Sequence, residues 1–197
     1  MLHYKLILSA AAITLTIAAF WPYIRSIRLG RTRPHVFSWI IWGVTTFLVF
    51  LAQLSDGGGV GAWPIGISGL LTIGVAVLAF LKRGDLQITK TDWLFLILAF
   101  CSLPLWYLTA SPFLAVLVLT LVDLLGFGPT FRKAYHHPYE EQLLFFWLML
   151  LRNLFAFAAL EVFTPATVTF PLTIAMACLV FIIMVVLRRG VRPPPAV

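Results

Sequence analysis

The 197 residues are 61% hydrophobic and only 11% charged, and their mean hydropathy is +1.01. A chain of this composition cannot cover itself with a polar surface, which excludes a soluble domain and predicts an integral membrane protein. The net charge of +7 could suggest nucleic acid. However, the basic residues gather between apolar runs, so they indicate the lipid bilayer as partner and argue against nucleic acid.

Seven apolar stretches approach the ~20 residues that a membrane-spanning helix needs. The first runs on into a sequence that recurs deep in the chain, so we expect a helix there and not a cleaved signal peptide. The expected spanning helices are Leu6–Ile24, His35–Leu54, Ala62–Leu81, Trp93–Thr109, Pro112–Phe131, Gln142–Phe163 and Val168–Leu187.

Lys and Arg residues follow the first, third, fifth and seventh stretches, whereas the other three connections hold none. The positive-inside rule therefore predicts an external N-terminus and a cytoplasmic C-terminus, in what we expect to be a bacterial inner membrane. Only Lys5, near the N-terminus, opposes this orientation. The glycine-rich connection Gly57–Gly61 is expected to be a flexible external turn, with Gln53 and Glu161 either at an external mouth or simply facing water.

A short sequence occurs twice, as Phe20-Trp21-Pro22-Tyr23-Ile24-Arg25 and, 107 residues later, as Phe127-Gly128-Pro129-Thr130-Phe131-Arg132. Trp63-Pro64-Ile65 returns at the same offset as Phe170-Pro171-Leu172. A constant offset predicts an internal duplication. We therefore divide the chain into a first three-helix repeat (1–90), a linker helix (91–110) and a second repeat with a short tail (111–197). Pro22 and Pro129 are expected to bend or end their helices and to act as hinges.

Two parallel triplets joined by one helix, with a proline near the end of each first helix, resemble the SWEET and PQ-loop superfamily of transporters. Where the PQ-loop pattern has Pro-Gln, this chain has Pro22-Tyr23 and Pro129-Thr130. The stretches 33–42 and 123–135 are similar to a group of small bacterial membrane proteins at the edge of that superfamily. The resemblance implies a seven-helix, 3-1-3 fold and transport of a small solute by alternating access.

Two ionisable residues lie deep within the predicted helices, Asp123 and Arg152. At 1.5 Å per residue, Asp123 lies roughly 12 Å above Phe131 and Arg152 roughly 15 Å above Gln142, so they share one depth. One interpretation is a structural ion pair between consecutive helices. The other is that Asp123 takes up a proton or Arg152 holds a polar or anionic solute during transport.

Polar and aromatic residues at similar depth complete the candidate substrate site. Asn153 adjoins Arg152 and is expected to face another helix or a cavity, while their equivalents Thr46 and Thr45 are expected to bond to their own backbone. Trp39 and Trp42 share a helix face. We expect Trp42 to face Trp147 across a slot for a flat ring, although tryptophans are also common membrane anchors. The predicted substrate-binding residues are Trp39, Trp42, Asp123, Trp147, Arg152 and Asn153.

These features favour a carrier, uniport or proton-coupled, for a small polar solute. The alternative is a seven-helix receptor or adaptor that binds a small ligand without moving it. An enzyme is not expected, because the embedded residues include neither a nucleophile with a base nor a cluster of metal ligands. We predict no cofactor and no metal, and interpret His136, His137, Glu140 and Glu141 as a solvated loop. The sequence is also compatible with a homo-oligomer.

Overall fold

A computed structural model describes residues 2–30, 36–82, 90–136, 138–140 and 143–191. Within these ranges the chain is helical and forms no strand. The helices are α1 (Leu2–Arg28), α2 (Val36–Ser55), α3 (Trp63–Leu81), α4 (Lys90–Thr109), α5 (Pro112–His136), α6 (Leu143–Ala159) and α7 (Pro165–Val191), with short 3-10 helices η1 (Gly59–Ala62) and η2 (Pro138–Glu140). Every predicted helix is present within a few residues of its expected bounds.

Four segments of the described chain are long and apolar enough to cross a membrane, namely His3–Arg28, Val36–Ser55, Gly59–Leu81 and Pro165–Val191. Shorter apolar helices cover Leu96–Thr109, Pro112–Phe127 and Leu143–Ala159. Large apolar side chains are exposed along the outer faces, and Trp21, Phe80, Tyr107 and Met176 are at least half exposed. An apolar exterior of this kind suits lipid and not water. The protein is therefore an all-helical membrane protein.

The two repeated prolines do not end their helices. Pro22 lies inside α1, which continues to Arg28, and α5 runs through position 129 to His136. The prolines were expected to bend or end their helices, and of these two outcomes the ending is wrong at both positions. A proline removes one backbone donor and can be accommodated by neighbouring helices in a membrane protein. The helix α6 is shorter than expected, because it ends at Ala159.

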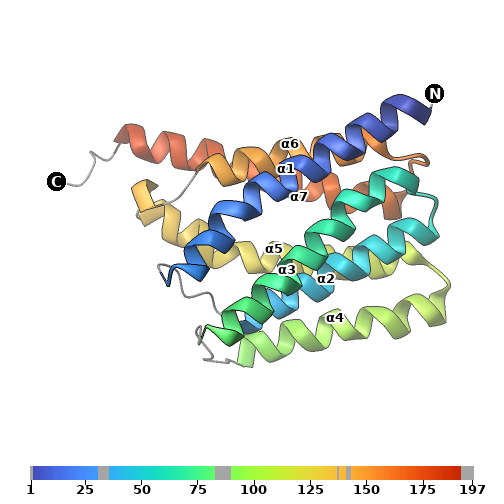
Figure 1. Cartoon of the computed structure of the whole chain (residues 1–197). Coiled ribbons are helices and arrows are strands. Elements are labelled where there is room, and N and C mark those ends of the chain that lie inside the picture. The colour runs from blue at the N-terminus through green and yellow to red at the C-terminus, as the bar shows by residue number, and fades with distance from the viewer. Residues whose placement is uncertain (1, 31–35, 83–89, 137, 141–142, 192–197) are drawn as a thin grey trace.

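The helices lie alongside one another and form a ring of six with α4 outside it (Figure 1). We call α1–α3 the first triplet and α5–α7 the second. In each triplet the third helix packs against both others, α3 against α1 and α2, and α7 against α5 and α6. The main interfaces between the triplets are α2 with α5 and α1 with α6, and α2 with α7 and α3 with α6 make smaller contacts. Exchanging the triplets turns one interface into the other, so the ring has an approximate two-fold arrangement.

Burial repeats between the triplets as well. A shift of 107 residues pairs the buried Ala12 of α1 with the buried Leu119 of α5, and Val49 of α2 with Ala156 of α6. Between α3 and α7 the buried positions match at a shift of 106 instead. Thr72 then corresponds to Cys178, both buried. The offset expected from the two proline sequences therefore holds for the first two helices of each triplet.

The third helices need one residue less. By burial, Pro64 of α3 corresponds to Phe170 of α7, and Ile65 corresponds to Pro171. The alignment of Pro64 with Pro171 at the common offset is thus one residue out of register. A shift of one residue rotates the position of a side chain by about 100° around the helix. Only the corrected alignment therefore matches the buried positions of α3 with the buried positions of α7.

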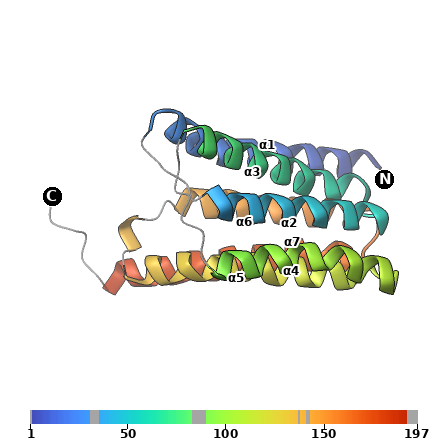
Figure 2. The ribbon, with the colours of Figure 1, turned by 90° about the horizontal axis from the view of Figure 1, so that it is seen from below.

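The start of α1 and the end of α7 lie at opposite ends of the bundle (Figures 1 and 2). We call these two ends the N-terminal end and the basic end. The N-terminal end also holds the connections α2–α3, α4–α5 and α6–α7. Arg25, Arg28, Lys82, Arg188 and Arg189 lie at the basic end. Further basic residues of this pattern, Arg31, Arg33, Arg83 and Arg192, are outside the described residues.

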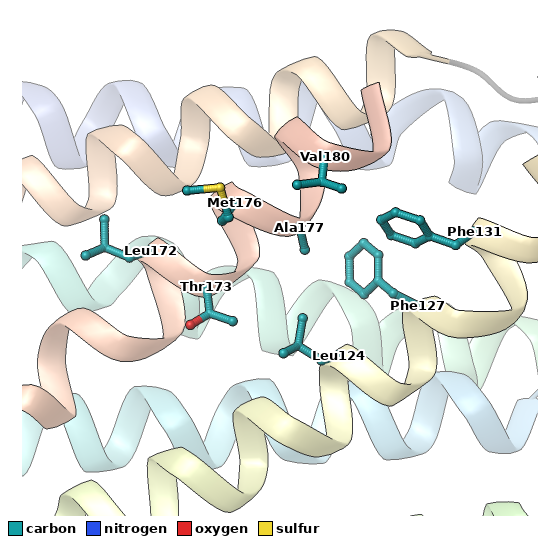
Figure 3. A pocket seen from close by; sticks show the side chains of 8 residues that line it. All are labelled: Leu124, Phe127, Phe131, Leu172, Thr173, Met176, Ala177 and Val180. Carbon is teal, nitrogen blue, oxygen red and sulfur yellow. The ribbon is translucent and has the colours of Figure 1, made fainter. Parts of the chain in front are cut away.

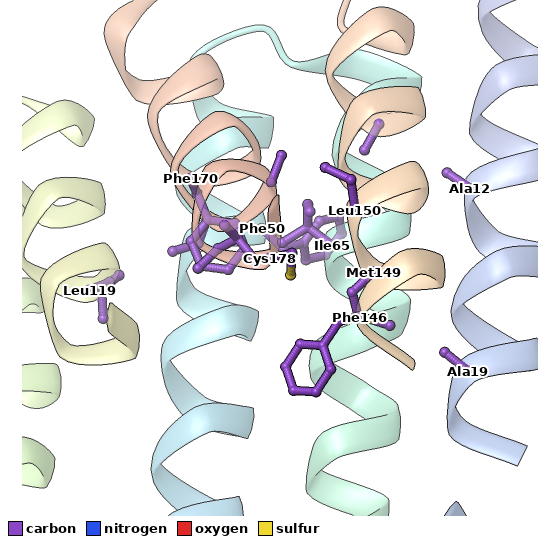
Figure 4. Close-up of a cluster of buried hydrophobic side chains, with 14 of the residues drawn as sticks. Ala12, Ala19, Phe50, Ile65, Leu119, Phe146, Met149, Leu150, Phe170 and Cys178 are labelled. Atoms are coloured by element: carbon purple, nitrogen blue, oxygen red, sulfur yellow. The ribbon is translucent and has the colours of Figure 1, made fainter. Parts of the chain in front are cut away.

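Apolar side chains from both triplets fill the middle of the ring. Phe50 of α2, Ile65 of α3 and Cys178 of α7 gather there (Figure 4). Met149 and Leu150 of α6 belong to the same buried cluster. The buried polar residues Asp123 of α5 and Arg152 of α6 lie on the inward faces of their helices, among the apolar side chains.

Candidate functional site

Asp123 forms a polar contact between the triplets. It lies near the middle of α5 and is 6% exposed. Its Oδ1 accepts a hydrogen bond of 2.5 Å from the hydroxyl of Thr45 on α2, which is fully buried. The same hydroxyl is 3.0 Å from the carbonyl oxygen of Trp42. Thr45 was expected to bond to its own backbone, and its hydroxyl does contact the Trp42 carbonyl of the same helix; in addition it joins α2 to α5.

Arg152 forms a second polar contact between the triplets. Its guanidinium is 3% exposed, and Nη2 donates to the Ser68 hydroxyl of α3 over 3.0 Å. Nη2 is also 3.6 Å from the sulfur of Met149. Within the described part of the chain, the buried Nε and Nη1 have no hydrogen-bond partner. Cys178 of α7 is an electrostatic neighbour of the guanidinium. Burying a guanidinium in this way is costly unless something else accepts its remaining N–H groups.

Asp123 and Arg152 do not form the direct ion pair that one interpretation expected. Within the described chain, no carboxylate oxygen lies within 4.0 Å of the Arg152 nitrogens, whereas Ser68 and Met149 do contact them. The reason is geometric. Asp123 contacts α2 from α5, and Arg152 contacts α3 from α6. The two side chains therefore belong to different contacts between the triplets.

The two buried amides each satisfy one of their polar atoms. Asn153 donates through Nδ2 to the Met149 carbonyl over 2.8 Å, while its Oδ1 has no partner. Asn153 was expected to reach another helix or a cavity, yet its amide nitrogen bonds to its own helix. Gln53 is fully buried at the N-terminal end, where Nε2 donates to the Thr167 carbonyl over 2.7 Å and Oε1 has no partner. Gln53 therefore does not face water.

The predicted tryptophan slot is not formed. Trp42 lies against α5, where a Cβ on Gly126 would collide with the indole nitrogen. Trp147 is 45% exposed on the outer face of α6. The neighbouring Phe146 is the buried residue, and at the 107-residue shift it is Phe146, not Trp147, that corresponds to Trp39. Trp147 is therefore placed as an outward-facing aromatic residue, consistent with a membrane anchor.

Between the polar contacts and the basic end, aromatic rings from both triplets pack together. Trp39 stacks on Tyr23 at 4.9 Å and meets Phe20 edge-on at 6.3 Å. In the second triplet Phe146 stacks on Phe181 at 3.9 Å. Phe145 links the halves, since it contacts both Phe20 and Phe146. We call this group the aromatic cluster; its members are Phe20, Tyr23, Trp39, Phe145, Phe146 and Phe181.

At the N-terminal end, the corresponding connections of the two triplets bind each other. We call residues 56–62 and 160–167 the loop cluster. Glu161 donates its N–H to the Gly58 carbonyl over 3.2 Å and accepts from the N–H of Val60 over 3.1 Å. The Thr164 hydroxyl donates to Asp56. Lys5 donates to the Leu160 carbonyl over 2.7 Å, where a cation complements the end of α6.

The glycine-rich connection, which was expected to be a flexible external turn, contains η1 and hydrogen-bonds to the connection between α6 and α7. Gly57 and Gly59 have φ values of +80° and +58°, which favour glycine. A Cβ on Gly59 would collide with the Glu161 carboxylate, and one on Gly61 would collide with the backbone of Leu160. Glycine is required here because two backbones approach closely.

A shallow apolar groove of about 530 Å³ lies on the outside of the ring between α5 and α7 (Figure 3). Phe127 and Phe131 border it on α5, and Met176 and Val180 border it on α7. Its lining contains a single polar side chain, Thr173. The groove faces away from Asp123 and Arg152, so it belongs to the lipid-facing surface and not to the polar site.

Ser68 and Cys178, beside Arg152, were not among the predicted site residues. A signal for Ser68 was present: Ser68 and Thr72 are the polar residues of α3 and fall one helical turn apart on the face with Ile65. Of the weaker loop candidates, His136 ends α5, whereas His137 and Glu141 lie outside the described residues.

Comparison of the chain with family models, with curated proteins and with solved structures finds no match.

Proposed function

We propose that this protein is a carrier for a small polar solute, and that its two triplets rock against each other to expose a central site to either side of the membrane. The observation that carries the proposal is the position of the buried polar contacts. Thr45 with Asp123 and Ser68 with Arg152 both cross from one triplet to the other. A relative movement of the triplets would break both contacts and free their polar groups for a solute.

The layers on either side of the polar contacts support the same mechanism. The loop cluster joins the two triplets through hydrogen bonds at the N-terminal end, and the aromatic cluster joins them through ring packing nearer the basic end. Each layer would have to separate in turn for a solute to pass. Pro22 and Pro129 lie within the first helix of each triplet, beyond the polar level toward the basic end, and are the proposed hinges.

The orientation belongs to the proposal. Following the positive-inside rule, the basic end with Arg25, Lys82 and Arg188 faces the cytoplasm, and the loop cluster faces outward. Lys5 opposes the charge rule but is bound to the carbonyls of Leu160 and Glu161, just beyond the C-terminal end of α6, which supplies a local reason for a cation there. On this view the protein resembles SWEET and PQ-loop carriers in layout, with three helices, one linker and three helices.

Counterflow in proteoliposomes tests the proposal. Vesicles containing the purified full-length protein are loaded with unlabelled solute and supplied with labelled amino acids, sugars or nucleosides. We expect one class to accumulate above protein-free vesicles, and Asp123→Asn and Arg152→Lys to lower the rate at least about tenfold, which corresponds to about 1.4 kcal/mol. Lys82→Gln, a charge change at an exposed residue, should leave the rate unchanged.

Two results would refute the carrier. Saturable binding of a solute without counterflow would make the protein a receptor or adaptor. Neither binding nor counterflow of any class, with protein that remains folded and monodisperse, would remove the central polar contacts from a transport role and leave them as structural contacts between helices.

A further inference from the structure

Arg152 carries buried hydrogen-bond donors for which the contacts described so far supply no acceptor. The residue is 97% buried, and Nε and Nη1, which carry three N–H groups, have no partner among the residues that the structure describes. A guanidinium matches the geometry of a carboxylate and donates to it strongly. The Ser68 hydroxyl and the Met149 sulfur together occupy only Nη2. The unpartnered donors therefore call for an anionic or strongly polar acceptor at the middle of the ring.

Asp123 supplies the opposite charge at the same level without contacting Arg152. Its one described hydrogen bond comes from the uncharged hydroxyl of Thr45. A buried carboxylate and a buried guanidinium that remain apart each keep most of their desolvation cost. The other described acids with placed side chains, Asp56 and Glu161, lie in the loop cluster and are engaged there. The central level thus holds one positive and one negative group.

We propose that the substrate of this carrier is a small zwitterion of the amino acid class, with its carboxylate on Arg152 and its ammonium on Asp123. The inference rests on the proposed transport function and names its substrate. A zwitterion is electrically neutral and places each charge against an opposite one. A monoanion would leave Asp123 uncompensated, and a cation would leave Arg152 uncompensated, in an interior where such charges interact strongly.

The surroundings select the side chain of the substrate. No third charged side chain lies at this level among the residues whose placement is described, since Lys5, Arg28, Lys82 and Arg188 are all near the ends of the ring. Phe146, Met149 and Cys178 provide apolar surface nearby. The substrate therefore has an uncharged and mainly apolar side chain.

A set of matched compounds tests the proposal. The probes are L-leucine, its methyl ester, which lacks the carboxylate, and 4-methylpentanoate, which lacks the ammonium. Each is tested for its effect on the thermal unfolding of the full-length protein in lipid nanodiscs and for counterflow; alanine, valine and methionine series extend the panel. At least one zwitterion should bind at least tenfold more tightly than both of its single-charge analogues.

Variants assign each charge. Arg152→Gln should abolish the preference for the zwitterion over the ester, and Asp123→Asn should abolish the preference over the deaminated acid. Where either variant fails to fold, Arg152→Lys and Asp123→Glu keep the charge and should lower affinity while retaining the preference. Lys82→Gln is the control, because it removes an exposed charge far from the site.

Each outcome separates the substrate from the transport function. Counterflow of a sugar or nucleoside with no response to any zwitterion would overturn the substrate class and leave the carrier in place. Selective zwitterion binding without flux would support the site and overturn the carrier. Equal binding of the zwitterion and 4-methylpentanoate would identify a simple anion site and overturn the role given to Asp123.

Discussion

Thr45 and Arg152 occupy equivalent positions in the two triplets, and each hydrogen-bonds to the opposite triplet. Thr45 of α2 donates to Asp123 of α5 over 2.5 Å, and Arg152 of α6 donates to Ser68 of α3 over 3.0 Å. Equivalent positions thus carry different chemistry, a neutral hydroxyl in one half and a guanidinium in the other. The polar groups at the centre of the ring therefore differ between the two triplets, although the positions that carry them are equivalent.

The Thr45 contact should contribute measurably to stability. Thr45→Val keeps the shape of the side chain but leaves the buried Asp123 without its donor, so we expect a loss of about 1–3 kcal/mol in the free energy of unfolding. Thr45→Ser should recover most of that loss. Thermal unfolding in detergent or nanodiscs measures both.

Thr16→Val is the matched control for that prediction. Thr16 is also fully buried, but its hydroxyl donates to the Ala12 carbonyl of its own helix over 2.8 Å. Removing it leaves no carboxylate without a donor, so the loss should stay below about 1 kcal/mol. Equal losses for Thr16→Val and Thr45→Val would contradict a special role for the contact with Asp123.

Much of the fold follows from the sequence because membrane helices are dictated by apolar length. The spans and the basic residues that follow α1, α3 and α7 are local properties of the chain and are visible without any tertiary contact. The register of the repeats is harder, because it depends on which residues face inward. One residue separates the shift of α3 and α7 from that of the earlier helices, and burial of Thr72 and Cys178 reveals it.

The site could be predicted only in part, for a related reason. Asp123, Arg152 and Asn153 stand out because polar groups are rare in apolar helices, and all three are buried. Their partners depend on the order of helices in the ring. Arg152 binds Ser68 of α3 and not Asp123 because α6 contacts α3 beside their shared neighbour α1, an arrangement that no local pattern encodes.

Gly126 should be indispensable to the α2–α5 interface. A Cβ there would collide with the indole nitrogen of Trp42, so Gly126→Ala should force the two helices or the indole apart and cost about 1–3 kcal/mol. Gly74→Ala is the control, since nothing lies within 4 Å of its Cβ and alanine favours helix by up to about 1 kcal/mol. Unfolding midpoints that fall equally for both variants would argue against close packing at Gly126.

The Gly126 effect should also depend on Trp42. Trp42→Phe removes the nitrogen that a Cβ would meet, so the cost of Gly126→Ala should be at least halved in a Trp42→Phe background. A double-mutant cycle on the unfolding free energies measures this coupling. Strict additivity of the two changes would show that Gly126→Ala acts through something other than the indole.

The loop cluster should respond to substitution of its glycines far more than an isolated turn does. Gly59 and Gly30 both have positive φ values, +58° and +68°. In alanine this conformation costs about 1–2 kcal/mol at either position. Only at Gly59 would the Cβ also collide with the Glu161 carboxylate, because nothing lies within 4 Å of Gly30. Gly59→Ala should therefore destabilise by about 1–3 kcal/mol more than Gly30→Ala.

The added cost at Gly59 should disappear when its neighbour is shortened. Glu161→Ala removes the carboxylate that the new Cβ would meet, along with the bond from the Val60 N–H. In that background Gly59→Ala and Gly30→Ala should cost the same within about 0.5 kcal/mol. A persistent difference would place the strain in the backbone of the connection and not in its contact with Glu161.

Cys178 provides a direct test of whether water reaches the polar site. It is 1% exposed and neighbours Arg152, whereas Cys101 on α4 is exposed. In a Cys101→Ser protein, a closed ring protects Cys178 from small hydrophilic thiol reagents. If the triplets separate during transport, Cys178 should react slowly in the folded protein. A solute that fills about two-thirds or more of the sites should reduce the rate at least about threefold, because the rate follows the unoccupied fraction. Mass spectrometry of membranes before and after unfolding measures the labelled fraction. Labelling that occurs only after unfolding would mean that the centre of the ring stays dry, and the rocking movement of the triplets would then have to be abandoned.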